Sequence, residues 1–452
     1  MKSIMFFCIP AHGHHNPTFP VVKELVNRGN TVRFYSFNEF KDKVEATGAT
    51  FISCDAYLAE VTKEVESGEE TMSTTDMTIV DLQSTAKMDS FLQEVEEFKP
   101  DIIVSDSVCF WGKLTARKYK IPMVVSTTTF AFNKQSASYM KSSFAEIMDL
   151  IKGQKRVKAE LKNLEQHGYH EKSIMPLVQN DNYTDTIVYA TEKYQPLSNT
   201  FSKHYAFVGP SVSADYLLDK KNKRPLVYIS LGTVISNKPD FYKKCIEALK
   251  DETVDVIISC GRVVDPESLN GLAENVRVYR NVNQLEVLSK ANVFLTHNGM
   301  NSTSESLYMA TPMVLFPQTN EQRAVARRAK EMGAGIELKG ESVTEIHDAI
   351  MEVLNNGKYA DAAMSCRDFR SALGPKGAAD FIEAAPHLMP EEDKKNIRRE
   401  IIPGVLQLVF WCVMIAFMFS FKAFTGSDKW WIVAIVANVI FPFYKKLVAR
   451  LV

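Results

Sequence analysis

The stretch NVFLTHNGMNSTSESLYMATPMVLFPQTNEQ, residues 292–322, decides the fold predicted for this chain of 452 residues. It begins with an apolar run at 293–295 that is typical of a buried strand, breaks at a glycine-containing polar turn, and continues as a helix. A second apolar run, 313–316, ends at a second polar turn. This order predicts a parallel α/β fold, in which ligands bind outside the carboxyl ends of the strands. We therefore expect both polar turns to line one crevice.

The turn between the first strand and the helix has the composition of an anion site. It contains Gly299 and the small hydroxyl residues Ser302 and Thr303. Backbone N–H groups at a helix N-terminus point toward a ligand placed there, and the helix dipole adds roughly half a positive charge. We expect this turn to bind an anionic ligand.

The residue types of the same stretch resemble a known signature. They are similar to the donor-binding signature of family-1 UDP-glycosyltransferases, particularly the bacterial macrolide-glycosyltransferase branch. The resemblance runs without gaps through residues 292–322 and implies a GT-B fold, an α/β architecture of two facing Rossmann-like domains. The alternative interpretation of the stretch is a helix–strand corner without a ligand. The residues that carry the resemblance are His297, Gly299, Asn301, Ser302, Glu305, Pro317, Glu321 and Gln322.

Length and composition indicate two or three domains with an ordinary α/β composition. The 53 basic and 54 acidic residues give a net charge of -1, so no global field for nucleic acid is expected. The 7 cysteines include no C-x-x-C pair, which argues against a disulfide framework or a zinc site and indicates a reducing compartment. The apolar run at the N-terminus is too short for a signal peptide, so we expect a cytoplasmic N-terminus.

A histidine follows the first predicted strand. Residues 3–9 are apolar, and the turn after them contains Gly13-His14-His15-Asn16-Pro17. This turn resembles the Gly-His-x-x-Pro element of the same family. The resemblance implies that His14 is the catalytic base, because an imidazole that titrates near neutrality can take the proton of an acceptor hydroxyl. For His12 and His15, turn stabilisation or solvent exposure is the preferred interpretation.

An acid ends another predicted strand, 100–106. The resemblance implies that this residue, Asp106, orients the imidazole of His14 through its second nitrogen. The alternative interpretation is that Asp106 caps the helix predicted at 111–119. Both roles are compatible.

The resemblance also implies the donor contacts. His297 and Asn301, together with the hydroxyl residues Ser302 and Thr303, would bind the diphosphate. Glu305 would accept hydrogen bonds from both ribose hydroxyls. Glu321 and Gln322 would bind the hydroxyls of the sugar. No Asp-x-Asp element lies at a donor position, so we expect no catalytic metal and no cofactor other than a nucleotide-diphosphate sugar as co-substrate. The donor-binding residues predicted in this way are Thr233, Val282, Gln284, His297, Gly299, Asn301, Ser302, Thr303, Glu305, Glu321 and Gln322.

One part of the donor region departs from the family pattern. The family places an aromatic residue that stacks on the uracil where this chain has Asn281, and a proline where it has Asn283. A lost stacking face costs about 1–3 kcal/mol per base, by analogy with base–aromatic platforms. The preference for uridine is therefore left open by the sequence, with Tyr279 as a nearby alternative source of a ring.

The C-terminal tail contains two uncharged apolar segments. Residues 401–421 are long enough to cross a bilayer, whereas 430–444 form a shorter segment. Lysines and arginines flank both outer ends, which predicts cytoplasmic ends. We expect a membrane hairpin over 398–448 and an enzyme at the cell membrane with cytoplasmic catalytic domains. The alternative for the first segment is a buried core helix.

Together these features predict an N-terminal Rossmann-like acceptor domain over 1–212, a linker over 213–224 and a donor domain over 225–390. The expected reaction is inverting, metal-independent transfer of a sugar from a nucleotide-diphosphate sugar, with a UDP-sugar expected, to a hydroxyl of a lipophilic small molecule or lipid. The expected partners are the nucleotide sugar, this acceptor and the membrane, without nucleic acid. Two alternatives are a nucleotide-sugar epimerase or hydrolase on the same fold, and a non-catalytic membrane-tethered sensor.

Overall fold

The computed structural model divides the chain into two compact units, Met1–His387 and Leu388–Val452. The first unit contains both β-sheets. The structure describes residues 1–58, 73–89, 94–133, 135–139, 144–178, 181–212, 216–232, 237–387, 406, 409–417, 419–420, 436, 440–442 and 444.

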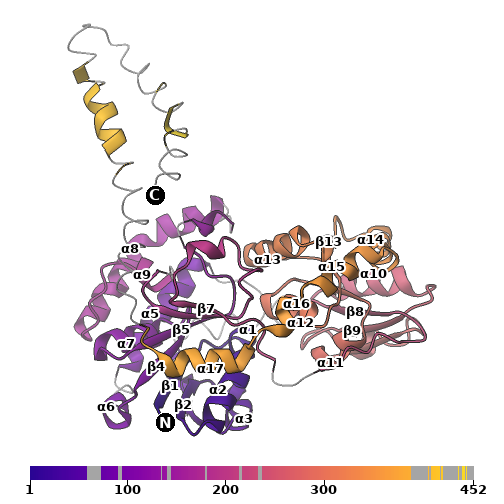
Figure 1. Cartoon of the computed structure of the whole chain (residues 1–452), viewed down its shortest axis with the longest axis horizontal. Coiled ribbons are helices and arrows are strands. Elements are labelled where there is room, and N and C mark those ends of the chain that lie inside the picture. Colours follow the sequence, from indigo (N-terminus) through magenta and orange to yellow (C-terminus); the bar gives the residue numbers. More distant parts are fainter. Residues whose placement is uncertain are drawn as a thin grey trace. The chain divides into compact units, whose positions relative to one another are not determined.

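The first half of unit one is built on a seven-stranded parallel sheet with the order β3-β2-β1-β4-β5-β6-β7 (Figure 1). Its strands are apolar runs because helices cover a parallel sheet on both faces. The strands are β1 (Ser3–Phe7), β2 (Thr31–Ser36), β3 (Thr50–Ser53), β4 (Ile102–Asp106), β5 (Met123–Thr127), β6 (Asp185–Val188) and β7 (Tyr205–Phe207). The α-helices of this half are α1 (His12–His15), α2 (Thr18–Asn27), α3 (Lys41–Glu45), α5 (Thr74–Met88), α6 (Glu94–Phe98), α7 (Phe110–Tyr119), α8 (Phe144–Gln166) and α9 (Met175–Val178).

The second half has a six-stranded parallel sheet with the order β10-β9-β8-β11-β12-β13. Its strands are β8 (Leu226–Ser230), β9 (Asp255–Ser259), β10 (Val276–Tyr279), β11 (Val293–Thr296), β12 (Met313–Leu315) and β13 (Gly335–Glu337). Its helices are α10 (Pro239–Leu249), α11 (Gln284–Lys290), α12 (Met300–Tyr308), α13 (Asn320–Glu331), α14 (Val343–Asn355), α15 (Gly357–Ser365) and α16 (Arg367–Ser371), followed by α17 (Gly374–Ala384). The prediction of two parallel α/β halves is confirmed.

Each sheet has a point at which the strand order reverses. In the first sheet this point lies between β1 and β4, and in the second it lies between β8 and β11. Ligands of open parallel sheets bind outside the carboxyl ends of the strands at such points. His14 follows β1, Asp106 ends β4, and His297 follows β11. The order of the strands therefore places all three residues at a switch point.

The last helix of unit one returns to the first half. In α17, Ala378, Ala379 and Ile382 belong to the same apolar cluster as α2 and β1. Arg28, at the end of α2, binds Asp380 and Glu383 at 2.6 and 2.8 Å. Although the sequence assigned this helix to the donor domain, its apolar face packs on the acceptor domain (Figure 1).

Two segments of the chain connect the halves, one that follows β7 and one that precedes α17, and they contact each other. The N–H of Gly374 donates to the carbonyl of Val208 at 2.8 Å. A Cβ at Gly209, which has a φ of 78°, would lie 2.3 Å from the Cβ of Ala372. Only a glycine fits here, because the position combines a left-handed backbone with a close approach.

The linker predicted at 213–224 is attached to the second half rather than fully solvated. The Nζ of Lys220 donates to the carbonyls of Leu288 and Ala291 at 2.7 and 2.6 Å, and to Oγ1 of Thr311 at 2.7 Å. Burial lowers the pKa of Lys220 to about 7, since its acceptors are neutral. Lys220 thereby supports the C-terminal end of α11.

The C-terminal unit gives no support to the predicted membrane hairpin. Across the described parts of the chain, every helix falls short of the length and apolar character needed to cross a bilayer. Most of the segment 398–448 lies outside the described residues. Membrane anchorage and the cellular location therefore stay predictions from the sequence.

We predict that Ile382→Ala destabilises the protein by about 2–5 kcal/mol, because Ile382 is fully buried between α17 and the first half. Urea unfolding followed by fluorescence measures the change. Lys376→Ala, on the exposed side of the same helix, is the matched control and should change stability by less than about 0.5 kcal/mol. Equal effects of the two changes would contradict the packing described for α17.

Candidate functional site

His14 and Asp106 form a hydrogen-bonded pair at the switch point of the first sheet. Nδ1 of His14 lies 2.7 Å from Oδ2 of Asp106. A carboxylate only accepts, so Nδ1 carries the proton and Nε2 is the basic nitrogen of the neutral ring. The second carboxylate oxygen accepts from the N–H of Val108 at 2.9 Å. Because Cys109 is the N-cap of α7, the alternative role of Asp106 as a cap is excluded.

The surroundings of His14 raise its pKa. Burial lowers the pKa, but the charge of Asp106 and the hydrogen bond to it act in the opposite direction, with smaller contributions from Glu321 and Asp81, and the net shift is upward. Thr128, which follows β5, places its Oγ1 3.2 Å from Nδ1. His14 is therefore a stronger base than a free imidazole, held by Asp106 in one orientation. Glu321 belongs to the second half, so a charge in one half raises the pKa of a histidine in the other.

His297 lies between two glycines at the switch point of the second sheet. A Cβ at Gly232 would come within 2.6 Å of the ring, and a Cβ at Gly299 within 2.7 Å. Burial lowers the pKa of His297 to about 4, so the ring is neutral at physiological pH. Its Nδ1 is buried without a hydrogen-bond partner among the described residues. The ring therefore keeps hydrogen-bonding capacity at the N-terminal end of α12.

Further polar atoms at the start of α12 are buried and unpartnered within the described part of the chain. Asn298, with a φ of 63°, has neither amide atom paired, and the hydroxyl of Thr303 is in the same state. Thr303 is fully buried, whereas Asn301 and Ser302 are partly exposed. The exposed pair is thus the accessible part of the predicted phosphate-binding set.

Glu305 and Gln284 are paired across α12 and α11. Nε2 of Gln284 donates to Oε2 of Glu305 at 2.7 Å and approaches Oγ of Ser302 at 3.3 Å. The hydroxyl of Tyr228 donates to the other end of the Gln284 amide at 3.3 Å. Burial raises the pKa of Glu305 to about 7, although the hydrogen bond from Gln284 opposes the shift. The carboxyl group therefore changes its charge close to neutral pH.

Gln322 has a structural role that the sequence interpretation missed. Its Oε1 accepts from the N–H groups of Gln318 and Thr319 at 2.7 and 3.2 Å, and its own N–H donates to Oγ1 of Thr319. This is a capping box at the start of α13. The capping box therefore leaves the amide N–H₂ of Gln322 for a sugar hydroxyl. The carboxylate of the neighbouring Glu321 takes no part in the capping box.

The turn that contains His14 contacts the start of α12 directly. Nδ2 of Asn301 donates to the carbonyl of Gly13 at 2.8 Å, which joins α12 to α1 (Figure 1). Arg262 of the second half binds Glu39 at 2.5 Å and His12 at 2.9 Å. His14 therefore lies on a short helix in which the second half contacts both His12 and Gly13. No local pattern in the sequence indicated the contact of Arg262.

Comparison with known proteins identifies the family. A family model described as UDP-glucoronosyl and UDP-glucosyl transferase matches residues 214–370. The chain is 32% identical over 396 residues to the uncharacterized UDP-glucosyltransferase YojK of Bacillus subtilis, a match that covers 84% of this chain and 97% of the relative. This chain belongs to the UDP-glycosyltransferase family.

One further relative agrees with this assignment, and a solved structure shows the same fold. The demethyllactenocin mycarosyltransferase of Streptomyces fradiae is 29% identical over 402 residues, covering 85% of this chain and 86% of the relative. The crystal structure of the glycotransferase of kitacinnamycin superimposes with a TM-score of 0.72 at 24% identity, covering 84% of this chain and 98% of that one. The enzyme is a UDP-glycosyltransferase with the GT-B fold.

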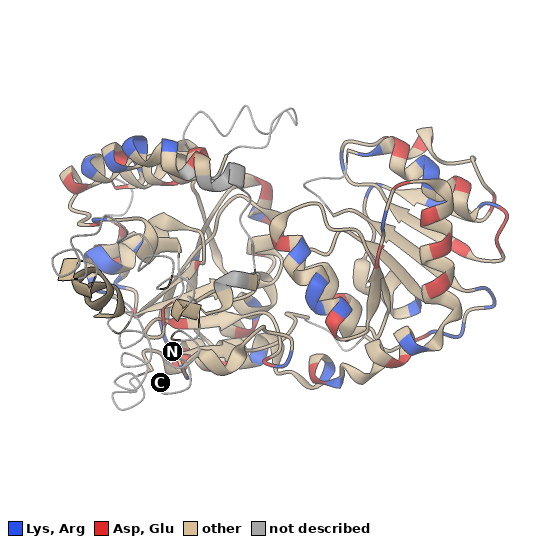
Figure 2. Cartoon of the chain, turned by 90° about the horizontal axis from the view of Figure 1, so that it is seen from above, with Lys and Arg blue, Asp and Glu red and all other residues tan. Residues whose placement is uncertain are grey.

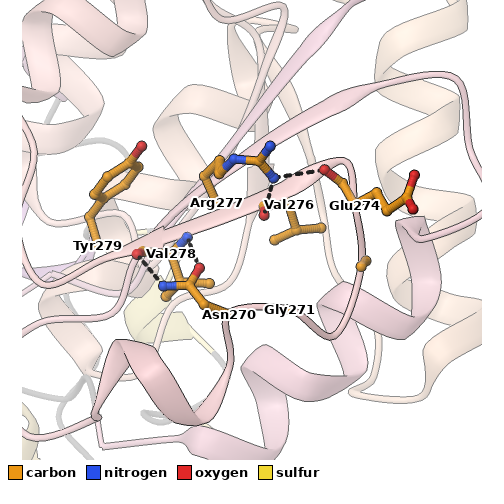
Figure 3. Close-up of a pocket in the computed structure, with 8 residues that line it drawn as sticks. Asn270, Gly271, Glu274, Val276, Arg277, Val278 and Tyr279 are labelled. Atoms are coloured by element: carbon orange, nitrogen blue, oxygen red, sulfur yellow. Dashed lines mark hydrogen bonds between the residues drawn. The ribbon is translucent and has the colours of Figure 1, made fainter.

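Two predicted or alternative donor contacts, Val282 and Tyr279, have other surroundings in the structure. Thr233 lies outside the described residues. Val282 packs against the apolar core of the second half. Tyr279, with Asn270 and Arg277, lines a depression of about 660 Å³ along the edge strand β10 (Figure 3). We therefore assign no base contact to Tyr279.

Other residues of this UDP-glycosyltransferase site were missed. Thr128 could have been predicted from the sequence, because it follows β5, which pairs with β4, the strand that ends at Asp106. Asp81 and Lys113 approach Asp106 from α5 and α7, as their electrostatic effects on each other show. Neither position carries a local sequence signal, since only the packing of the helices brings these residues together.

We predict that Glu305 makes stability depend on pH. A carboxyl group whose pKa is raised on folding contributes stability that is complete below its unfolded pKa and lost as the pH rises through about 7. Glu305→Gln should therefore remove a loss on the order of 2 kcal/mol between about pH 4.5 and 7. Denaturant midpoints measured across this range test it.

The matched control is Glu286→Gln, which removes an exposed carboxylate from the neighbouring helix α11. It should leave the slope of stability against pH as in the wild type. A Glu305→Gln variant with the wild-type slope would show that this carboxyl group titrates normally.

Proposed function

We propose that this UDP-glycosyltransferase moves a sugar from a nucleotide-diphosphate sugar, with a UDP-sugar as the expected donor, to a hydroxyl of a lipophilic small molecule. The observation that supports the proposal is the contact between Asn301 and Gly13, because it brings the turn that contains His14 to the N-terminus of α12. A base and an anion site that meet in this way suit transfer from an activated sugar to an acceptor.

In the proposed reaction, Nε2 of His14 takes the proton of the acceptor hydroxyl while the oxygen attacks the anomeric carbon. The bond between this carbon and the diphosphate oxygen breaks, and the diphosphate leaves with the electron pair. The resulting imidazolium is stabilised by Asp106, which is buried and accepts from Nδ1. A single displacement from the opposite face inverts the anomeric centre.

The second half would hold the donor. The amides at the start of α12, the side chains of Asn301 and Ser302, and the neutral ring of His297 would donate to the diphosphate. These donors stabilise the leaving group without a requirement for a metal ion. Glu305, whose carboxylate faces Gln284, would accept from the ribose hydroxyls.

The acceptor class is inferred from the relatives. The Streptomyces fradiae protein is named as a demethyllactenocin mycarosyltransferase, and we expect an acceptor of comparable size for this chain. Figure 2 shows Lys and Arg interspersed with Asp and Glu over the described residues, which agrees with a small neutral acceptor better than with a polyanion. The His14–Asp106 pair also favours acceptor chemistry over an epimerase, a hydrolase or a sensor.

We predict that His14→Ala lowers kcat/KM about 10²- to 10⁴-fold, because it removes the general base. Initial rates measured by UDP release with a lipophilic phenol or alcohol acceptor give the change. In the wild type the rate should fall as the pH drops through the raised pKa of His14, since the protonated ring accepts no proton. His170→Ala, at an exposed histidine, is the control, and full transfer activity in His14→Ala would disprove the mechanism.

We predict that the true donor raises the melting temperature without an acceptor. A ligand at 100 times its Kd stabilises the folded state by about 2.7 kcal/mol. A panel of UDP-, TDP- and GDP-sugars tests this by thermal shift, with product analysis for a free or epimerised sugar. Ser302→Ala should reduce the shift, whereas Ser371→Ala, an exposed serine, should not. Rapid release of free sugar or an epimer would favour the hydrolase or epimerase.

A further inference from the structure

A buried lysine lies behind the catalytic pair. Lys113, on α7, is 5% exposed, and its Nζ donates to the carbonyls of Ser107 and Leu177, each at 2.5 Å. Ser107 is in the turn after β4, and Leu177 is in α9. The ammonium group therefore joins the turn that follows Asp106 to α9.

The turn held by Lys113 is the one that fixes Asp106. The N–H of Val108 donates to Oδ1 of Asp106, and Oδ2 accepts from His14. A continuous path of contacts thus leads from the ammonium through Ser107 and Val108 to the carboxylate and the base. A neutral hydrogen-bond donor would be enough to hold this turn in place. The burial of a cation costs free energy, so the charge of Lys113 needs a further explanation.

Charged groups surround Lys113 from several elements. Burial lowers its pKa to about 8, and the largest opposing effect comes from Asp106. Cys109 and Asp181 act in the same direction as Asp106, whereas Arg117 acts against them. Asp81, on α5, interacts with both Lys113 and Asp106. The lysine therefore belongs to the electrostatic environment of the carboxylate that orients the base.

The charges that act on His14 are unbalanced without a cation. Asp106, Glu321 and Asp81 all favour the imidazolium form. A base is most effective when its pKa lies near the working pH, because a ring that stays protonated cannot accept a proton. Lys113 supplies a positive charge that interacts with two of these three carboxyl groups, Asp106 and Asp81.

We propose that Lys113 is a positioning residue for the transfer reaction, whose positive charge acts through Asp106 to oppose protonation of the imidazole of His14. The inference rests on the proposed role of His14 as the base. It assigns to Lys113 an electrostatic role in addition to its contacts with two backbone carbonyls.

The test is a pH titration of His14 by NMR in the full chain, labelled with ¹³C and ¹⁵N at histidine and assigned with His14→Gln. Lys113→Met removes the charge and should raise the pKa of His14 by about 0.5 to 1 unit. The acid limb of the kcat/KM profile should move to higher pH by the same amount. Lys113→Arg keeps the charge and should leave both values as in the wild type, as should Lys158→Met on the exposed face of α8.

Two measurements keep the test decisive if Lys113→Met does not fold. Lys113→Gln retains N–H donors without the charge and should give the same upward shift. In the wild type, the His14 resonance should show a second inflection near pH 8, where Lys113 loses its proton. Absence of this inflection would overturn the inference.

A purely structural role gives a different result. In that case Lys113→Met and Lys113→Gln lower the melting temperature and the rate at every pH, while the pKa of His14 stays unchanged, and the inference is wrong. Failure of the proposed function is separate, because it appears as a wild-type protein that transfers no sugar, whereas the NMR titration needs no activity.

Discussion

The arrangement of this enzyme depends on parallel strand pairing, which brings the carboxyl ends of neighbouring strands to one edge of a sheet. In both sheets the strand order reverses beside a polar turn, so the turns after β1 and β4 meet in the first half and those after β8 and β11 meet in the second. The hydrogen bond between His14 and Asp106 and the contact of His297 with Gly232 follow from these two meetings. The function of the site is thus built from loops, while its geometry comes from the sheets.

Burial gives the ionisable groups of the two halves different protonation behaviour. His14 is made more basic by a buried carboxylate, whereas burial makes His297 less basic, so that it stays neutral. Glu305 is protonated more readily than a free carboxylic acid because it is buried against a neutral amide. Two residues of the same type thereby differ in basicity between the two halves.

Much of this arrangement was predictable from the sequence, because local patterns determine it. The apolar runs at 293–295 and 313–316 form β11 and β12, and both His14 and Asp106 stand at predicted strand ends. The packing of α17 on the first half and the attachment of Lys220 depend on contacts between distant segments, which leave no local pattern. Gln322 shows a third kind of difference, since a residue expected to bind the sugar also caps the helix that carries it.

The two segments that connect the halves have a mechanical consequence. Val208 and Gly374 are hydrogen-bonded, and Gly209 lies against Ala372, so the outgoing and returning chains cross at one place. A domain connected by one segment of chain can rotate in any direction. A domain connected by two adjacent segments rotates mainly about the line between them. A rotation of the second half about this pair of segments would therefore separate α12 from α1 and break the hydrogen bond between Asn301 and Gly13.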